Sequence, residues 1–301
     1  MQRFDDHHPI AIFVWFLSVF ALTMLTMHPV LLLTSLVCAL AYRLLRSGRR
    51  SLRALLWLLP MFLLLCVLNP LLSHGGDTVL FFINQMPFTL EATVYGVCAA
   101  AMILATLTWF RVFSDIFTSE RLLMLLGALS SKLALLVSMG LRYIPLFTLR
   151  IRRVTDAQRA LGLYRDRSLV ERVRGGVRIF SVLLTWGLEQ GVVTADSMSA
   201  RGYGVARRTF AADARIRPRD VWMILGALAL CVGVCVPMAT GDLFAQFYPV
   251  ISFSSARPLS LLGYVCFLLL CAWPTAVDGM YRVLWRVRYA RTPGQAVRWT
   301  I

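Results

Sequence analysis

The stretch from Thr155 to Thr209 determines how this chain is organised, and its centre reads Asp-Ser-Met-Ser-Ala-Arg-Gly-Tyr-Gly at residues 196–204. It is the one long region that cannot lie in a membrane. Forty residues earlier, residues 156–162 read Asp-Ala-Gln-Arg-Ala-Leu-Gly. The two segments share the spacing Asp-x-x-x-Ala-x-Gly. We therefore interpret them as a short internal repeat.

The second copy of the repeat is typical of a helix end. Glycine commonly follows the last helical residue because it tolerates positive φ, and Gly202 or Gly204 can take that place. An arginine in the last turn is stabilised by the helix dipole, and its planar fork can also bind a carboxylate on another protein. Arg201 is therefore either a helix cap alone or a cap that also contacts a partner.

Composition indicates an all-α polytopic membrane protein. Of the 301 residues 58% are hydrophobic and only 15% are charged, with a mean hydropathy of +0.70. The net charge of +16 comes from 30 arginines and one lysine against 15 acids. Such an excess suits nucleic acid or the cytoplasmic face of a membrane. The hydrophobicity favours the lipid bilayer and argues against a nucleic-acid partner.

Six apolar runs are long enough to be predicted as transmembrane helices. The first two share one turn at His28-Pro29, and a re-entrant hairpin is the alternative for that pair. The predicted spans are Ile10–Met27, Pro29–Leu45, Leu52–Leu72, Glu91–Phe113, Val221–Gly241 and Leu259–Val277.

Arginine distribution predicts the orientation, because cytoplasmic loops collect positive charge. Five arginines lie in residues 43–53 and 19 basic residues lie in 111–220, whereas residues 73–90 contain none. Both termini are therefore expected in the cytoplasm of a multi-pass protein of the cell membrane. We expect an N-terminal membrane domain over 1–113, cytoplasmic coupling helices over 114–220, and a membrane hairpin with a basic tail over 221–301.

The cytoplasmic segment is expected to be helical. The amphipathic stretch Thr118–Met139 should end at Gly140 and Pro145, and a second helix should run to about Gly162. Ser168-Leu169-Val170-Glu171 has the form of a capping box. A third helix from Ser168 to Arg201 would then be about 50 Å long.

This long helix carries more apolar surface than a free cytoplasmic helix should expose. The surface either binds partner subunits or packs against Thr118–Met139. Gly187 and Gly191 indicate either a close helix crossing or a hinge, since glycine inside a helix is unfavourable by about 1 kcal/mol relative to alanine. The predicted apolar face consists of Val177, Phe180, Leu184, Gly187 and Leu188.

Several chemistries have no sequence support. The chain lacks a phosphate-binding G-x-x-x-x-G-K-[ST] motif, so it is not expected to be an ATPase. The six apolar runs contain no charged residue or histidine except within three residues of their ends, which argues against a stand-alone carrier. No catalytic triad or metal-ligand spacing is evident, so we expect no enzyme activity, cofactor or metal site. A membrane-embedded enzyme and a stand-alone carrier are the alternatives.

The repeat resembles the paired docking motifs of the transmembrane (T) component of energy-coupling factor (ECF) transporters. Ala200-Arg201-Gly202-Tyr203 is similar to the second motif. Ala157-Gln158-Arg159-Ala160-Leu161-Gly162 is similar to the first, except that Leu161 stands where the arginine belongs and Arg159 lies two residues earlier.

The resemblance implies a scaffold that couples two ABC-type ATPase subunits, which bind the ATP, to a small substrate-binding (S) membrane subunit. The cargo would be a vitamin or a transition-metal ion such as cobalt or nickel. The helix ends at Ala160-Leu161-Gly162 and Ala200-Arg201-Gly202 would contact the ATPases, with Arg201 making the stronger contact. The apolar faces of the coupling helices would carry the S subunit.

Overall fold

The computed structural model describes residues 4–48, 58–72, 78–83, 86–162, 169–205, 216–243, 245–247, 252–253 and 258–290. The chain divides into two compact units. Unit 1 comprises Met1–Thr118 with Ile216–Ile301, and unit 2 comprises Ser119–Arg215. The N-terminal and C-terminal parts of the chain therefore fold together.

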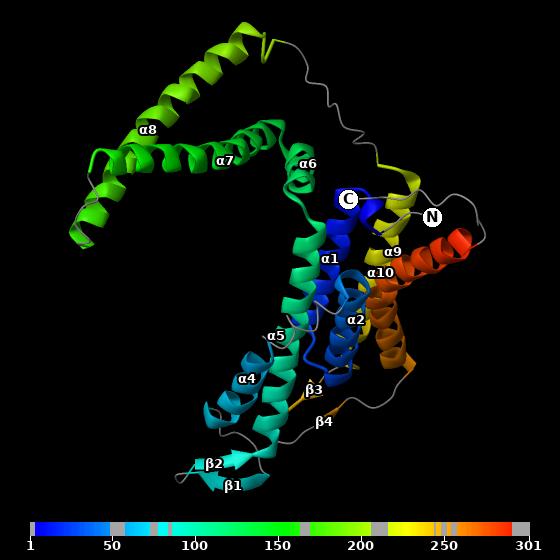
Figure 1. Ribbon diagram of the computed structural model, residues 1–301. Helices are drawn as coiled ribbons and strands as arrows, with labels where there is room; N and C mark the ends of the chain where they lie inside the picture. The colour runs from blue at the N-terminus through cyan, green and yellow to red at the C-terminus, as the bar shows by residue number, and fades with distance from the viewer. Residues whose placement is uncertain are drawn as a thin grey trace. The chain divides into compact units, whose positions relative to one another are not determined.

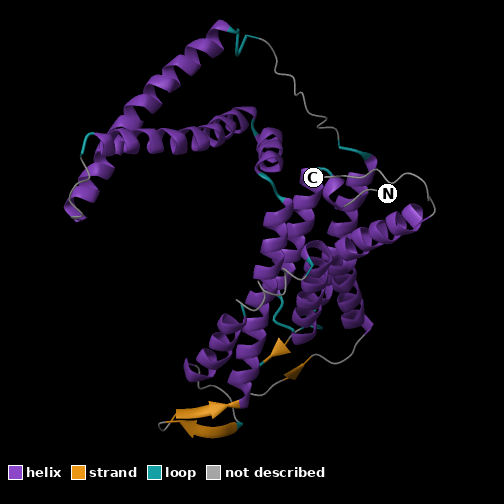
Figure 2. Ribbon diagram, viewed as in Figure 1, coloured by secondary structure: helices purple, strands orange, loops and turns teal. Residues whose placement is uncertain are grey.

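Over its described residues, unit 1 is a helical bundle with two short β-hairpins, which confirms the predicted all-α polytopic class (Figures 1 and 2). The hairpins were not predicted, and each contains two strands. The helices are the 3-10 helix η1 (Phe4–Asp6), α1 (Pro9–Leu25), α2 (Pro29–Ser47), α4 (Leu59–Leu72), α5 (Leu90–Ile116), α9 (Pro218–Ala239) and α10 (Pro258–Ala290). The strands are β1 (Val79–Ile83), β2 (Met86–Thr89), β3 (Ala245–Gln246) and β4 (Ser252–Phe253).

Local sequence explains where these helices begin. Proline is the first residue of α1, α2, α9 and α10, a position where the missing N–H is not needed and the fixed φ suits a helix. The hydroxyl of Thr89 accepts a hydrogen bond from the N–H of Ala92 at the start of α5. The prolines and the Thr89 cap therefore determine where helices begin in a largely apolar sequence.

Buried aromatic rings join the helices of unit 1. Trp15 on α1 and Trp109 on α5 are almost fully buried, and their ring centroids lie 5.5 Å apart. The indole N–H of Trp109 donates to the hydroxyl of Ser35 on α2 over 3.1 Å. That hydroxyl also lies 3.2 Å from the hydroxyl of Thr23 on α1. Helices α1, α2 and α5 thus share both an aromatic contact and a satisfied polar contact.

The N-terminal segment is anchored to helices from both ends of the chain. Phe4 is fully buried, and its N–H donates to one carboxylate oxygen of Asp278 on α10 over 2.9 Å. The hydroxyl of Tyr42 on α2 donates to the other oxygen over 3.0 Å. His7 Nδ1 lies 2.8 Å from Asp220 at the start of α9. Residues separated by more than 200 positions therefore meet at this end of unit 1.

The expected spans are only partly confirmed by helix length and composition. Among the described residues, five helices are long and apolar enough to cross a bilayer: α2, α5, α9, α10 and α7 of unit 2. Helix α1 has 17 residues, about 26 Å, and α4 has 14, so both fall short. Residues 52–57 of the predicted third span lie outside the described residues.

The described residues of unit 2 form three helices: α6 (Ser119–Leu129), α7 (Ser131–Ala160) and α8 (Leu169–Ala200). The expected helix end at Gly140 and Pro145 is wrong, because α7 continues through both. The break lies at Ser130, whose backbone is extended with φ −155° and ψ 120°. Propensity predicts a break at a proline, which removes one helical hydrogen bond. Helix α7 continues through Pro145, and Tyr143 and Phe147 on either side of it contact α8.

Helix α8 begins at Leu169, which directly follows Ser168, the first residue of the predicted capping box. Ser168 and the linker 163–167 lie outside the described residues. The helix has 32 residues and a length of about 48 Å. The predicted long, continuous helix is therefore present.

Replacing Asp278 by alanine should lower the thermal stability of the purified protein in detergent. The substitution leaves the Phe4 N–H and the Tyr42 hydroxyl without their acceptor, a loss of about 1 to 3 kcal/mol for a buried donor. Asp115→Ala is the matched control, because Asp115 is exposed. Equal unfolding temperatures for the two variants would contradict a structural role for the N-terminal anchor.

Candidate functional site

The end of α8 forms a complete Schellman C-cap. Gly202 has φ +71°, its N–H donates to the carbonyl of Ser199 over 2.9 Å, and the N–H of Tyr203 donates to the carbonyl of Met198 over 3.0 Å. These two bonds satisfy carbonyls that a helix end otherwise leaves without partners. Gly204 also has positive φ, at +95°. The helix is therefore terminated by its own backbone, and the side chain of Arg201 is not consumed by capping.

The end of α7 repeats the described part of this geometry forty residues earlier, up to Gly162. Gly162 has φ +76°, and its N–H donates to the carbonyl of Arg159 over 2.9 Å. The N–H of Leu161 donates to the carbonyl of Ala157 over 3.1 Å, as the N–H of Arg201 donates to the carbonyl of Ser197 over 3.2 Å. The short sequence repeat is thus a repeat of structure.

The repeat places Leu161 and Arg201 at the same position, the residue that precedes the positive-φ glycine. Leu161 is 77% exposed and Arg201 is exposed. Arg159 matches Ser199 rather than Arg201, and its guanidinium lies 4.0 Å from the carboxylate of Asp156. Arg159 therefore does not take the position of the missing arginine.

Helices α7 and α8 cross each other (Figure 1), and Phe147 and Trp186, near the middle of each sequence range, are in contact. The ring of Phe147 on α7 meets Trp186 on α8 edge to face, with centroids 5.5 Å apart and an interplanar angle of 84°. The guanidinium of Arg150 lies 5.4 Å from the centroid of the Trp186 ring. On the other side of the crossing, the hydroxyls of Tyr143 and Thr194 are 3.1 Å apart. An aromatic contact, a cation–π contact and a hydrogen bond therefore hold the crossing.

Gly187 lies at this crossing. A Cβ at this position would lie 3.3 Å from Cζ of Phe147, which is tighter than ordinary contact, whereas a Cβ at Gly191 would have nothing within 4 Å. The helix is continuous through both positions. This geometry favours close approach at Gly187 over a hinge.

Most of the predicted apolar face of α8 is exposed. The exposed fractions are 62% for Val177, 66% for Phe180, 53% for Leu184 and 67% for Leu188. Helix α6, which forms the first part of the stretch Thr118–Met139, does not cover these side chains. The alternative that intramolecular packing buries this face is therefore wrong for these four residues.

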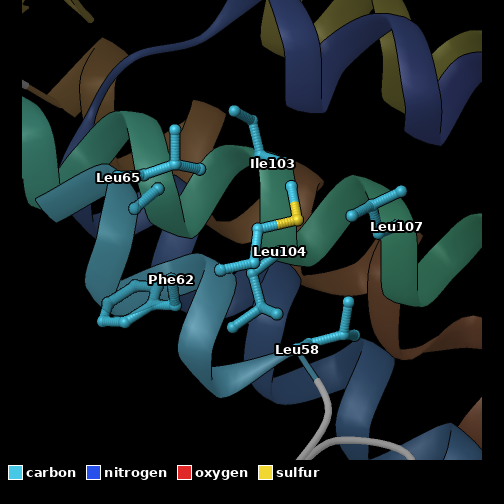
Figure 3. Close-up of a pocket in the computed structure, with 8 residues that line it drawn as sticks. Leu58, Phe62, Leu65, Ile103, Leu104 and Leu107 are labelled. Carbon is cyan, nitrogen blue, oxygen red and sulfur yellow. The ribbon is translucent and has the colours of Figure 1, made fainter. Parts of the chain in front are cut away.

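Two features of unit 1 were not predicted from the sequence. An apolar groove between α4 and α5 is lined by Leu58, Met61, Phe62, Leu65, Ala100, Ile103, Leu104 and Leu107 (Figure 3). A polar pocket of about 230 Å³ is lined by Asp5, Arg46, Asp278, Tyr281 and Arg282. Leucine-rich runs give no sequence signal for a groove, and the pocket joins residues from three distant segments. In the described part of the chain no three His, Cys, Asp or Glu residues are grouped to hold a metal ion.

The comparison with known families accounts for the repeat and the apolar helices together. A family model described as cobalt transport protein, CbiQ, matches residues 7–210. The chain belongs to the CbiQ family. The match begins before α1 and ends after α8, so it includes both helix ends and the crossing. No curated protein sequence matches the chain.

Membership of the CbiQ family makes the chain a component of a transport system and places it in a membrane. It also confirms the resemblance to T components that the repeat suggested. Tyr143, Phe147 and Arg150 contact α8 at the crossing, and none of the three was predicted as a site residue. The sequence indicated a crossing through Gly187 on α8, not through these residues of α7.

Gly187→Leu should disrupt the crossing, because the added side chain must displace the ring of Phe147. Gly191→Leu is the matched control on the same helix, where an added Cβ meets nothing. Hydrogen–deuterium exchange of peptides covering 143–150 and 186–194 measures the effect. We expect faster exchange in both peptides for Gly187→Leu and no change for Gly191→Leu; protection retained in the Gly187 variant would contradict close packing.

Proposed function

We propose that this chain is the transmembrane scaffold of an ECF-type importer, which transmits ATP-driven motion from two ATPase subunits to a separate substrate-binding membrane subunit. The observation that carries the proposal is the pair of helices that each end at a positive-φ glycine, with an exposed side chain directly before it. A scaffold that contacts two ATPases needs two such ends. The family match supports cobalt transport as the process.

The end of α8 is suited to a protein partner. Arg201 is exposed, and its planar guanidinium has five donors available for a carboxylate. The Schellman bonds fix the backbone beneath it, so little ordering is needed when the side chain is buried in an interface. An exposed arginine on a preorganised helix end has the properties of an interface anchor.

The apolar faces of α7 and α8 are suited to a membrane partner. Helix α7 is apolar over a length sufficient for a membrane span, yet none of its apolar window is buried in the protein. Its middle contacts α8, whose first turns carry Arg172, Arg174 and Arg178 on exposed positions. A spanning α7 would bring these arginines to the bilayer, which is costly. We therefore assign α7 to the coupling helices, with its apolar surface available to a hydrophobic S subunit.

The proposed cargo is the cobalt ion, bound by the S subunit rather than by this chain. Nickel and vitamins are the other cargoes that the resemblance to T components allows. Uptake assays with labelled cobalt, competed by nickel or by a corrinoid, distinguish them. Cobalt uptake that depends on this chain and on ATP supports the proposal, and ATP-independent uptake by the purified chain in liposomes supports a stand-alone carrier.

The proposed orientation has both termini in the cytoplasm, as the distribution of arginines suggests. Single cysteines at Gly48 and Thr78, in a background without the seven native cysteines, test it with a membrane-impermeant thiol reagent on whole cells. We expect labelling at position 78 and protection at position 48. The reverse pattern would invert the topology.

Arg201→Ala should weaken co-purification of the ATPase subunits strongly. Losing one partner of a desolvated charge pair costs about 2 to 5 kcal/mol, so the complex should dissociate during purification and cobalt uptake should fall with it. The matched control is Arg178→Ala, an exposed arginine on the same helix. Wild-type ATPase recovery from the Arg201 variant would remove this helix end from the proposed interface.

A further inference from the structure

The polar pocket of unit 1 combines opposite charges from three segments of the chain. It has a volume of about 230 Å³ and is lined by Asp5, Arg46, Asp278, Tyr281 and Arg282. Asp5 lies on η1, Arg46 lies in the last turn of α2, and the other three residues lie on α10. Two arginines and two aspartates give the lining no net charge. A ligand that carries one positive and one negative charge therefore matches this pocket better than a simple anion does.

One pair of these charges is already joined. Nη1 of Arg46 lies 2.9 Å from Oδ1 of Asp5, and only 25% and 24% of the two side chains are exposed. A guanidinium has five N–H donors, so Arg46 keeps donors for a further acceptor. The Arg46–Asp5 pair therefore forms a neutral wall of the pocket that can still donate hydrogen bonds.

The other two charges line the same pocket without pairing. Asp278 and Arg282 are four residues apart on α10, a spacing at which opposite charges commonly interact. In the part of the chain that the structure describes, no ion pair joins either of them to a charged group. Asp278 instead accepts from the N–H of Phe4 and the hydroxyl of Tyr42, which are both neutral donors. Its carboxylate is thus held in place with its charge uncompensated, and each oxygen has a second lone pair for another donor.

The pocket lies where two helices leave the apolar layer. The apolar span of α2 ends at Arg46, and that of α10 ends at Trp285. Helix α10 has 33 residues, about 50 Å, and so extends beyond a hydrocarbon core of about 30 Å. The rings of Tyr281 and Trp285 have centroids 6.2 Å apart, and Trp285 is 54% exposed. Tyrosine and tryptophan are enriched at the depth of the lipid headgroups, which places the pocket at that depth.

Lipid chemistry supplies a ligand with both charges. The phosphodiester of a phospholipid accepts hydrogen bonds from guanidinium groups such as those of Arg282 and Arg46. The ammonium of an ethanolamine headgroup has three N–H donors, and Asp278 is a suitable acceptor. An anionic headgroup without an amine would place a second negative charge beside Asp278, which is unfavourable. A choline headgroup carries the positive charge but has no N–H to donate.

We propose that this pocket binds the headgroup of phosphatidylethanolamine, with the phosphate at Arg282 and Arg46 and the ammonium at Asp278. The bound headgroup contacts η1, α2 and α10 together. It therefore completes the polar contacts that hold the N-terminal segment against helices from both ends of the chain. This binding concerns the membrane domain alone and does not depend on the ATPase subunits or on the cargo.

Lipid titration of the purified full chain tests the choice of headgroup. Native mass spectrometry in detergent measures binding of phosphatidylethanolamine, phosphatidylcholine and phosphatidylglycerol with identical acyl chains. We expect the ethanolamine lipid to bind at least about fivefold more tightly than the other two, because it alone provides both a phosphate and an N–H donor. Equal binding of the three lipids would overturn the proposal, and so would tightest binding of either the choline or the glycerol lipid.

Substitution of Arg282 tests the phosphate contact. Arg282→Gln should weaken binding of the ethanolamine lipid about tenfold, because a charge-assisted hydrogen bond to the phosphate is lost. The side chain is exposed, so the variant should fold normally. Arg174→Gln is the matched control, an exposed arginine of unit 2 that should leave lipid binding unchanged. Wild-type affinity in the Arg282 variant would contradict the proposed site.

Substitution of Asp278 tests the ammonium contact through a ratio of affinities. Asp278→Asn should reduce the preference for the ethanolamine lipid over the choline lipid to about one. Both lipids are measured on the same folded protein, so a loss of stability alone does not change this ratio. A preference retained in the variant would place the ammonium elsewhere and overturn the proposal.

The soluble headgroup distinguishes a lipid site from a site for a free phosphate compound. Glycerophosphoethanolamine should bind at least about a hundredfold more weakly than the lipid, because it buries no acyl chain. Equally tight binding of the soluble compound would assign the pocket to a soluble ligand and overturn the lipid assignment.

Discussion

A positive-φ glycine one residue beyond the tip defines how each long helix of unit 2 ends. At Gly202 two backbone hydrogen bonds satisfy the last carbonyls, and the preceding side chain is left exposed. Gly162 has the same positive φ and the equivalent first hydrogen bond, so the two helices end alike over the described residues. An L-residue at either glycine would be strained in this conformation, so the display of Leu161 and Arg201 depends on these two positions.

The contacts at the crossing connect α7 to α8, so the ends of the two helices belong to one packed structure. Phe147, Trp186 and Gly187 provide close contact at the crossing, and the hydroxyls of Tyr143 and Thr194 add a polar contact. Packed aromatic contacts resist relative sliding better than a loose linker does. In the scaffold account, motion delivered at one tip reaches the exposed apolar faces because the two helices move together.

Sequence reasoning found the features that depend on local pattern. Apolar runs predicted most of the helices, and the spacing of Ala160-Leu161-Gly162 and Ala200-Arg201-Gly202 predicted their matched ends. It failed where packing overrides propensity, because α7 continues through Pro145 while it contacts α8. It also could not find the anchor formed by Phe4, Tyr42 and Asp278, since those residues are joined only in three dimensions. The apolar groove on α4 and α5 gave no signal for the same reason.

Direct imaging of the assembled transporter is the most direct test of the central claim. Electron microscopy of the complex with a non-hydrolysable ATP analogue locates the ATPase subunits relative to α7 and α8. The account predicts the guanidinium of Arg201 within hydrogen-bond distance of a carboxylate of one ATPase and the end of α7 in contact with the other ATPase. Both tips exposed to solvent in the assembled, ATP-bound complex would contradict it.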